Sequence, residues 1–454
     1  MRIELTDNNI KCENNIYSRN DIASLFPIAD KTIDELCKDN ENLLIFPHSI
    51  RESDDRIGSA SILNIISTSK PNNVRIMTNN IMGFIGIGNL QIKIKSRFDN
   101  GRDDYFLHYM LQKVMSFNLF DLKHNNEQED IFDFIMFLFP YYLKNAIRQG
   151  MYREYKSFKH NDSNIKGTID LNRHICRNIP FNGNVSYTTR EHSHDNDMTQ
   201  LIRHTIEFMM SKQYGNIVLN IDRETISNVK YFIEHTSSYN KSERSKIISK
   251  NLRFKSHPYF SEYQPLQSLC LQILRMEEIK YGYDSNEICG VLFDGAWLWE
   301  EYLNTILKEH GFVHPENKLS KGRIYLFEDM NEQGKKKTSG YRYPDFYKEN
   351  IVLDAKYKRL GSYEKVSKVD NNDIHQLITY MNNLKATHGG FIAPLEKTNT
   401  TRPSSHLKGS KSEISIYGIE ICRKAESYAD FAEIMKQNEA EFIKSINATL
   451  SDSN

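Results

Sequence analysis

Residues 343–356 read YPDFYKENIVLDAK, and this stretch decides the fold. Residues 341–346 form one extended run, and residues 351–357 form a second run that is rich in β-branched and aromatic side chains. The polar residues 348–350 separate the two runs. Two strand-like runs joined by a short polar turn predict a tight β-hairpin.

Three charged side chains lie on this hairpin. Asp354 and Lys356 are two residues apart, so one strand directs both side chains to the same face. Asp345 can meet them across the strand pair. Two acids and a cation at one point suit a divalent metal and a scissile phosphate. The acids hold Mg²⁺, the metal acidifies a water, and the lysine orients that water or offsets charge. An exposed strand with a cross-strand ion pair is the alternative interpretation.

The sequence before the hairpin predicts a helix over residues 294–307, because apolar side chains recur there at helical spacing. Asp294 is its candidate N-cap, and Gly311 lies just past its end. Glu300 flanks the apolar stripe more closely than Glu301, so Glu300 is the better candidate to reach the metal site. A solvated acidic pair on the polar face of the helix is the alternative.

The elements around the hairpin complete a recognisable order. Residues 322–328 read as a first strand, residues 371–384 as a second helix, and residues 389–394 and 413–422 as later strands. Together with the hairpin they give the αβββαβ order of the PD-(D/E)XK nuclease fold. The pair Pro344-Asp345 followed by Asp354-x-Lys356 resembles the signature of that fold.

The second helix carries Gln376 and Tyr380, which are four residues apart and therefore share one helix face. Their spacing resembles the Gln-x-x-x-Tyr element of many relatives of this nuclease fold, where it supports the site. Ordinary packing of Tyr380 in the helix interface is the alternative.

The whole chain has the composition of a soluble protein. It contains 454 residues, which predicts two or three domains, with 39% hydrophobic and 26% charged side chains. The longest apolar run, residues 134–143, contains Pro140 and is far shorter than a bilayer span of ~20 residues. The first residues show no apolar signal core, and the six cysteines are scattered without a CxxC pair. We therefore expect a cytoplasmic protein with reduced thiols and no membrane segment.

Charge is balanced over the whole chain but not around the hairpin. The formal net charge is zero, whereas residues 335–359 hold eight cations and three anions. This local excess of positive charge predicts phosphate contacts, and a solvated flexible loop is the alternative. The candidate DNA-binding residues are Lys335, Lys336, Lys337, Lys358 and Arg359.

The rest of the chain divides by pattern. Residues 1–105 predict a β-rich region, residues 106–285 a mainly helical middle domain, and residues 286–454 the domain with the hairpin. Gly83, Gly86 and Gly88 precede a strand rather than open a helix, so they do not match a dinucleotide-binding loop. We expect no nucleotide to bind to this chain.

One further cluster, residues 192–197 (HSHDND), has the short spacing of metal ligands. The chain shows no obvious distant ligand to complete such a site. A loop that enters a helix, with Asp195 or Asp197 as the N-cap, is the favoured interpretation.

Several segments, in their order along the chain, resemble McrC-type proteins of the McrBC restriction systems, and the LlaJI-like branch in particular. The segments are IKIKSRF at 92–98, YFLHYML at 105–111, GMYREY at 150–155, IKGTID at 165–170 with Arg173, and LFDGAWLWEEY at 292–302. The resemblance runs from about residue 80 to about residue 425, and residues before about 60 do not take part in it.

This resemblance implies an α and β multidomain protein with a PD-(D/E)XK, restriction-endonuclease-like domain built on a mixed central sheet. It implies that Asp345 and Asp354, helped by the Ala355 main-chain carbonyl, hold Mg²⁺, with Mn²⁺ as a possible substitute. By the same resemblance Lys356 positions the attacking water, and Glu300 completes the metal shell or orients a water.

The resemblance also implies partners. A McrC-type subunit cuts DNA together with a separate McrB-type AAA+ hexamer that hydrolyses GTP, and stimulates that GTPase. The N-terminal region of this chain would contact the motor, and two nuclease domains would pair for a double-strand break. The setting is the cytoplasm of a prokaryote defending itself against phage.

Two other function classes remain open at this stage. The chain could act mainly as a non-catalytic activator of an AAA+ motor. It could also be a stand-alone PD-(D/E)XK nuclease, such as a resolvase or a transposon end-cutter. Cleavage by the purified chain without partner or nucleotide would favour the stand-alone nuclease.

Overall fold

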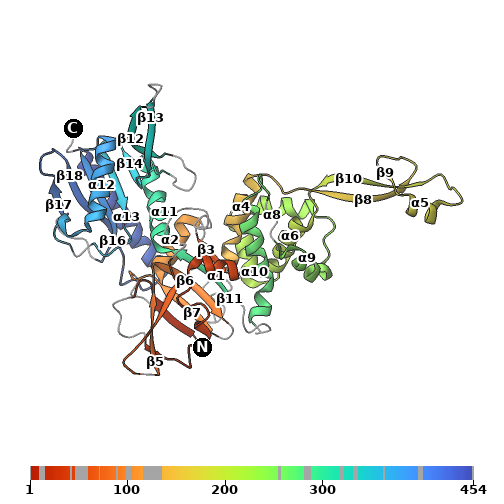
Figure 1. Cartoon of the computed structure of the whole chain (residues 1–454), viewed down its shortest axis with the longest axis horizontal. Helices are drawn as coiled ribbons and strands as arrows, with labels where there is room; N and C mark the ends of the chain where they lie inside the picture. The colour runs from red at the N-terminus through yellow and green to blue at the C-terminus, as the bar shows by residue number, and fades with distance from the viewer. Residues whose placement is uncertain are drawn as a thin grey trace. The chain divides into compact units, whose positions relative to one another are not determined.

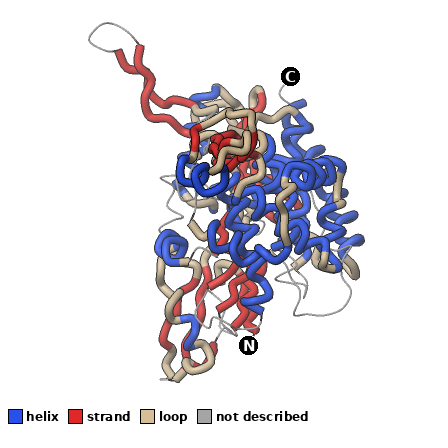
Figure 2. The backbone as a smooth tube through the Cα atoms, turned by 90° about the vertical axis from the view of Figure 1, so that its right-hand side faces the viewer, coloured by secondary structure: helices blue, strands red, loops and turns tan. Residues whose placement is uncertain are grey.

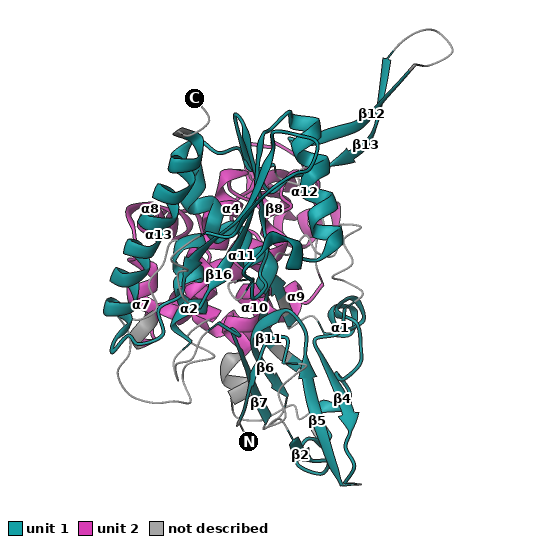
Figure 3. Cartoon of the chain, turned by 90° about the vertical axis from the view of Figure 1, so that its left-hand side faces the viewer, with its two compact units in different colours: residues 1–123, 285–454 teal, residues 124–284 magenta. Residues whose placement is uncertain are grey.

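The protein is described from a computed structural model that covers residues 2–9, 16–40, 43–46, 60–70, 72–87, 90–98, 104–115, 135–253, 257–280, 288–315, 322–330, 336–360, 363–396 and 402–451. The chain forms two compact units. Unit 1 combines residues 1–123 with residues 285–454, and unit 2 consists of residues 124–284 (Figure 3). The expected mixture of helices and several sheets is confirmed.

The first sheet of unit 1 takes strands from both ends of the chain. Its strand order is β1-β7-β6-β11-β3. The strands are β1 (Arg2–Thr6), β3 (Leu43–Phe46), β6 (Ile81–Ile87), β7 (Leu90–Lys95) and β11 (Ile288–Asp294). β11 pairs antiparallel with β6 and parallel with β3. Residues assigned by sequence to the C-terminal domain therefore build the centre of the N-terminal sheet.

A smaller sheet covers this first one. It has the order β2-β5-β4, formed by β2 (Ile16–Ser18), β4 (Leu63–Ser67) and β5 (Asn73–Thr78). The short elements η1 (Ala23–Leu25) and α1 (Ile33–Asp39) pack beside it, and Thr32 caps α1 in a capping box with Glu35. Side chains from both sheets share one core that includes Leu36, Ile76 and Ile92.

The second large sheet of unit 1 contains the predicted hairpin. Its order is β14-β15-β16-β18-β17, with β15, β16 and β18 parallel and the two edge strands antiparallel to their neighbours. The strands are β14 (Phe346–Lys348), β15 (Ile351–Ala355), β16 (His388–Leu395), β17 (Ser404–His406) and β18 (Glu413–Glu420). The mixed central sheet expected from the sequence is thus present.

Helices cover this sheet. α12 (Asn371–Leu384) has the bounds predicted from the sequence, and Asp370 is its N-cap. Its apolar face enters the core of the sheet through Leu377, Tyr380 and Met381. α11 (Gly295–Leu307) is capped by Asp294, and Trp299 donates a hydrogen bond to the carbonyl of Ile392 in β16. The elements η5 (Lys308–His310) and η7 (Val366–Lys368) lie in the connections.

Two further helices of unit 1 pack with α11 through a buried polar contact. Glu439 of α13 (Tyr428–Ser451) accepts hydrogen bonds from Tyr302 of α11 and from Tyr109 of α2 (Tyr105–Met115). Lys113 of α2 completes the contact as an ion pair with Glu439. α2 therefore belongs to unit 1, although the sequence pattern placed it in the helical middle region.

The predicted first strand of the central sheet is placed differently by the structure. Residues 322–328 belong to β12 (Ile324–Met330), which pairs with β13 (Lys336–Arg342) in a separate two-stranded ribbon. The ribbon projects from the rest of unit 1 (Figures 2 and 3). The predicted continuous run 341–346 is also broken, because β13 ends at Arg342 and β14 begins at Phe346. Pro344 lies in the break and has no N–H to donate to a ladder.

Unit 2 consists of a helical bundle and an arm. The helices are α4 (Phe139–Arg148), α6 (Asp197–Met210), α7 (Gln213–Leu219), α8 (Arg223–His235), η4 (Lys241–Glu243), α9 (Arg244–Asn251) and α10 (Tyr263–Lys280). The arm consists of β8 (Glu154–Asp162), β9 (Thr168–Ile169), α5 (Leu171–Asn178) and β10 (Val185–Ser193), and it extends from the helices of the unit (Figure 1). Among the described helices, none has the length and apolar character needed to span a membrane.

Candidate functional site

Asp345 lies in the break between β13 and β14, where the chain is free of ladder hydrogen bonds. Its Oδ2 accepts a hydrogen bond of 2.7 Å from the backbone N–H of Ala355, the last residue of β15. The interruption at Pro344 therefore turns the Asp345 carboxylate toward the end of the neighbouring strand. The hairpin register, with Phe346 opposite Leu353, places the two strands so that this bond can form.

Asp354 and Lys356 lie at the C-terminal end of β15 and face each other, as their spacing predicts. The Lys356 Nζ lies 2.7 Å from Oδ2 of Asp354 in an ion pair. The Asp354 side chain is only 1% exposed, and its Oδ1 has no hydrogen-bond partner among the described residues. The Lys356 backbone N–H donates to the carbonyl of Ile392, which fixes the segment to β16.

The electrostatics of these carboxylates are unusual. Burial and the charge of Glu300 raise the pKa of Asp345 to about 8, against the lowering effects of Lys356 and the Ala355 N–H. Burial and the charge of Asp345 raise the pKa of Asp354 to about 7, although Lys356 opposes this. Because the two carboxylates are desolvated and repel each other, binding of a cation near them would stabilise their ionised forms.

Lys356 responds in the opposite way. Burial lowers the pKa of its ammonium, but the carboxylates of Asp354, Asp345 and Asp373 raise that pKa by more, so that it lies above its ordinary value. The ammonium therefore keeps its proton at neutral pH and acts as a fixed positive charge.

Glu300 of α11 approaches the same place. Its charge contributes to the raised pKa of Asp345, and its Oε1 lies 3.8 Å from Nε2 of His314. His314 in turn contacts the carbonyl of Asp345 through Nδ1 at 2.7 Å and stacks on Phe346. His314 was not singled out from the sequence, because one histidine in an irregular connection carries no pattern.

Asp373 is the second residue that the sequence pattern missed. It lies in the first turn of α12, where its Oδ1 is 3.5 Å from Lys356 Nζ and its Oδ2 is 2.6 Å from Lys358 Nζ. An acid in the first turn of a helix is ordinary, because it interacts favourably with the helix dipole. The only available signal was its position three residues before Gln376, on the helix that carries the supporting pair.

Gln376 and Tyr380 do form a pair. Gln376 Nε2 donates a hydrogen bond of 2.8 Å to the Tyr380 hydroxyl. Burial raises the pKa of Tyr380, and the charges of Asp345 and Asp354 raise it further, so the phenol lies close to the acidic group. The structure therefore brings together six predicted residues, which are Glu300, Asp345, Asp354, Lys356, Gln376 and Tyr380.

The predicted DNA-binding cations do not gather at one point. Lys335 lies outside the described residues. Lys336 and Lys337 are on the ribbon, where Lys336 pairs with Glu328 at 2.7 Å. Lys358 pairs with Asp373 beside the carboxylates, and Arg359 lies 3.6 Å from Glu396.

The segment after Lys356 is anchored in the first sheet. The Tyr357 ring is buried against Phe98, and its hydroxyl lies 2.7 Å from Oγ of Ser96 at the end of β7. The Arg97 guanidinium stacks on the same ring at 4.8 Å, and Arg359 donates a hydrogen bond to the carbonyl of Arg97. The residues that flank the site on its C-terminal side are therefore held by the N-terminal sheet.

A buried ion pair lies behind this anchor. Arg97 Nε donates to Oδ2 of Asp7 at 3.0 Å, and the Asp7 side chain is fully buried. Burial raises the pKa of Asp7 to about 6, while Arg97 and, to a lesser degree, Arg359 lower it.

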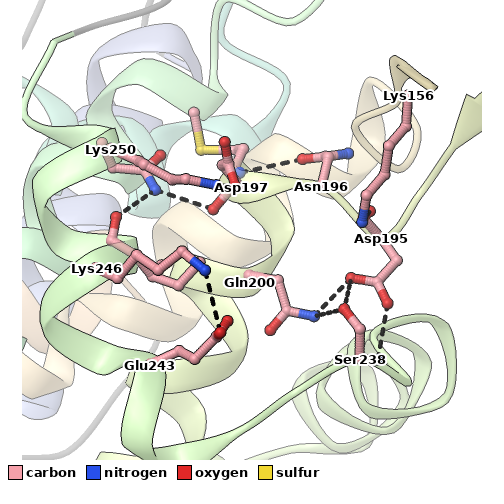
Figure 4. Close-up of polar contacts among 12 residues, drawn as sticks. Lys156, Asp195, Asn196, Asp197, Gln200, Ser238, Glu243, Lys246 and Lys250 are labelled. Atoms are coloured by element: carbon pink, nitrogen blue, oxygen red, sulfur yellow. Dashed lines mark hydrogen bonds and ion pairs between the residues drawn. The ribbon is translucent and has the colours of Figure 1, made fainter. Parts of the chain in front are cut away.

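The cluster at residues 192–197 is a helix entry, as favoured from the sequence, but its N-cap was wrongly assigned. Asn196 caps α6 by accepting from the N–H groups of Met198 and Thr199. Asp195 instead accepts hydrogen bonds from Gln200 and from Ser238, and Asp197 pairs with Lys250 (Figure 4). Within the described parts of the chain, no group of three or more His, Cys, Asp or Glu side chains is arranged to hold a metal ion.

Chains in solved McrBC complexes are similar to this chain. A solved half-complex from the tetradecameric assembly of Thermococcus gammatolerans McrB AAA+ hexamers with bound McrC contains a similar chain. The likeness has 14% identity and a TM-score of 0.47, and covers 96% of this chain and 100% of that chain. A chain in the cryo-EM structure of the Thermococcus gammatolerans McrBC complex is also similar, with 14% identity and a TM-score of 0.32. This likeness covers 68% of this chain and 87% of that chain. No curated protein matches the chain.

A family model extends over more than half of the chain. It describes the McrBC 5-methylcytosine restriction system component and matches residues 76–394. The matched region begins in β5 and ends in β16, so it includes the whole group around Asp345, Asp354 and Lys356. The chain belongs to the McrBC family of restriction system components.

Proposed function

We propose that this chain is the McrC-type nuclease subunit of a McrBC-like, LlaJI-related restriction system. In this role it cleaves DNA in the presence of Mg²⁺ when a GTP-hydrolysing AAA+ partner activates it. The observation that carries the proposal is the meeting of Asp345, Asp354 and Lys356 at the end of β15, with Glu300 beside them. We assign α11, β14, β15, α12 and β16 to a PD-(D/E)XK core.

Asp345 and Asp354 fit a divalent cation by their chemistry, although no preformed group of three or more acidic, histidine or cysteine ligands is found among the described residues. Oδ1 of Asp354 is buried and has no hydrogen-bond partner among the described residues, and burial keeps both carboxylates from ionising easily. A cation would supply the missing partner. Asp345, Asp354 and the Ala355 carbonyl would hold it, with Glu300 at the edge. Mg²⁺ commonly binds through one or two carboxylates and completes its shell with waters and substrate phosphate.

The bound metal would supply Lewis-acid activation of the phosphate and of a water. The chain's own residues contribute orientation and charge. Because its pKa is raised, Lys356 remains an ammonium, so it orients the water or balances charge on the phosphate rather than removing a proton. The Gln376–Tyr380 pair and the Asp345–Ala355 hydrogen bond hold the site from two sides.

A plasmid assay with the purified chain tests this proposal. We expect cleavage only when Mg²⁺, the AAA+ partner and GTP are all present, and loss of cleavage when a chelator removes the metal. Cleavage without the partner and nucleotide would instead identify a stand-alone nuclease. Stimulated GTP hydrolysis without any cleavage would identify a non-catalytic activator.

Replacement of Asp373 by asparagine is expected to lower kcat for cleavage about tenfold, which corresponds to ~1.4 kcal/mol. Lys356 loses the second carboxylate near its ammonium, and Lys358 loses its ion-pair partner. KM for DNA should change little. Asp370→Asn is the matched control, because it removes an acid from the same helix start while asparagine still caps α12. An unchanged kcat in Asp373→Asn would remove Asp373 from the site.

The arm of unit 2 carries exposed apolar side chains. Four large apolar side chains of the arm are more than half exposed, namely Leu171 (67%), Ile175 (55%), Ile179 (64%) and Phe181 (68%). Leu171 and Ile175 lie four residues apart and share one face of α5, which the small arm sheet does not cover. Exposed apolar surface that gathers in one place indicates a binding site. We propose that the AAA+ partner contacts this surface, in addition to the contact proposed for residues 1–105.

Replacing Leu171 and Phe181 together by serine is expected to weaken the complex with the AAA+ partner at least about tenfold. Burial of each such side chain contributes ~1.5–3 kcal/mol, and a factor of ten needs about 1.4 kcal/mol. GTPase stimulation, measured over a titration of the chain, reports the change. Tyr259→Ser, which removes an 80% exposed aromatic ring of unit 2 outside the arm, is the control. Equal stimulation by all three proteins would show that the arm does not bind the motor.

A further inference from the structure

The ribbon β12–β13 buries little of its own surface. Beyond Leu326 the described residues of β12 are exposed, and Lys336, Lys337 and Thr338 of β13 are exposed as well. An isolated two-stranded ribbon is at best marginally stable in water, so contacts beyond its own two strands stabilise such a ribbon. This ribbon nevertheless displays Phe327 at 60% and Tyr341 at 53% exposure.

The backbone of the ribbon holds these rings at its surface. Gly340 has a φ of +66°, and a Cβ at this position would lie 2.7 Å from the Phe327 ring. A larger residue at this position would be strained by the positive φ and would push the Phe327 ring aside. The rings of Tyr341 and Tyr343 meet edge to face at 6.0 Å, and this contact continues the aromatic surface toward Asp345.

Cations accompany the aromatic rings. Lys337 and Arg342 are exposed, and neither has an acidic partner in the described part of the chain. The ribbon's own acids are already engaged, since Glu328 pairs with Lys336 and Asp329 accepts a hydrogen bond from Ser339. The ribbon thus offers positive charge next to apolar rings, a combination that suits the phosphates and the apolar groups of a nucleic acid.

The position of the ribbon relates it to the proposed catalytic residues. β13 ends at Arg342, and Asp345 follows three residues later, so at most about 10 Å of chain separates the two. The major groove of duplex DNA is about 12 Å wide and admits a two-stranded β-ribbon. A ribbon seated in the groove would therefore bring the backbone of the same duplex to the carboxylates.

We propose that β12–β13 binds in the major groove of the substrate duplex beside the scissile phosphate. Phe327 and Tyr341 contact apolar base or sugar surface, and Lys337 and Arg342 contact phosphates. This inference rests on the proposed nuclease function and adds to it the surface that holds the DNA.

A binding experiment with the full-length chain and a short fluorescent DNA duplex tests the inference. Fluorescence anisotropy measures the affinity, with Ca²⁺ in place of Mg²⁺. The double variant Phe327→Ser/Tyr341→Ser is expected to bind at least about tenfold more weakly, since burial of each such side chain contributes ~1.5–3 kcal/mol and a factor of ten needs about 1.4 kcal/mol. Its unfolding midpoint should not change, because both rings are exposed. Tyr259→Ser is again the matched control.

The charged residues give a second, independent measurement. Lys337→Ala and Arg342→Ala are each expected to reduce the slope of log affinity against log salt concentration by about one. Wild-type affinity in the aromatic double variant, or no duplex binding by the wild-type chain, would overturn the inference. So would a weakened complex with the AAA+ partner at unchanged DNA affinity, because the ribbon would then be a protein contact.

These outcomes are separate from those of the proposed function. Failure of the ribbon variants to alter binding leaves plasmid cleavage and its dependence on Asp354 untouched. Undiminished cleavage by Asp354→Asn, in contrast, would refute the nuclease assignment whatever the ribbon does.

Discussion

Replacement of Asp354 by asparagine is expected to reduce DNA cleavage about a thousandfold or more, with DNA binding retained. Asparagine keeps the shape of the side chain but removes the charge that would hold the cation and order Lys356. Loss of one such electrostatic interaction in a desolvated site costs ~4 kcal/mol of transition-state stabilisation. Rates of plasmid cleavage under single-turnover conditions, with partner, GTP and Mg²⁺ saturating, provide the measurement.

Stability distinguishes this loss from misfolding. Burial raises the pKa of Asp354 to about 7, so ionisation of this carboxyl group costs free energy in the folded protein. Asparagine removes that cost, and Asp373 still lies 3.5 Å from the Lys356 ammonium. The thermal midpoint of Asp354→Asn should therefore equal or exceed that of the wild type above neutral pH, and GTPase stimulation should persist. A variant that still cleaves at the wild-type rate would show that the chemistry occurs elsewhere.

Replacement of Arg97 by alanine is expected to lower the free energy of unfolding of unit 1 by about 3–5 kcal/mol. The substitution leaves the fully buried carboxylate of Asp7 without its ion-pair partner. It also removes the guanidinium that stacks on Tyr357, next to Lys356. Chemical denaturation reports the stability change, and cleavage should fall more than stability alone explains, because the segment that carries Lys356 loses its anchor.

Two controls isolate the ion pair. Lys95→Ala changes the last residue of β7, two positions before Arg97. The ion-pair partner of Lys95, Glu4, is 44% exposed, and this change should cost no more than about 1 kcal/mol. The double variant Asp7→Asn/Arg97→Ala should recover a large part of the lost stability, because no buried charge remains. If Arg97→Ala and Lys95→Ala were equally mild, the Asp7–Arg97 pair would not stabilise the sheet.

The free energy of unfolding should depend on pH through the carboxyl group of Asp7. Its pKa is about 6 in the folded protein, whereas that of a free aspartate side chain is 3.8. An acid with a raised folded pKa contributes stability below the unfolded pKa, and this contribution is lost as pH rises through the folded pKa. The wild type should thus lose stability between about pH 4 and pH 6, and Asp7→Asn should lack this part of the change.

The local elements of the site could be predicted from the sequence, because each is specified by neighbouring residues. Alternating and helical patterns predicted the hairpin and α12, and the two-residue spacing placed Asp354 and Lys356 on one face. Asp373 and His314 could not be found in this way, since their roles depend on contacts with residues distant in the chain.

The long-range pairings were missed for the same reason. The sequence of β11 has the pattern of a buried strand, but this pattern does not say which strands it pairs with. Tertiary packing selects β6 and β3 as its neighbours. Tyr357 reads as one more aromatic residue after a strand, but the structure inserts it against Phe98 of the first sheet. Domain boundaries drawn from composition therefore separated residues that fold together.

The placement of β11 in the first sheet has a consequence for the order of events on the ribosome. β1, β3, β6 and β7 emerge early, but the sheet stays without the strand between β6 and β3 until residue 294 has been synthesised. Unit 2 is continuous in sequence, so all of its residues emerge before β11 does. Domains generally fold as units during synthesis, N-terminal parts first. In this chain the intervening unit is complete first, and the group around Asp345, Asp354 and Lys356 is completed only after it.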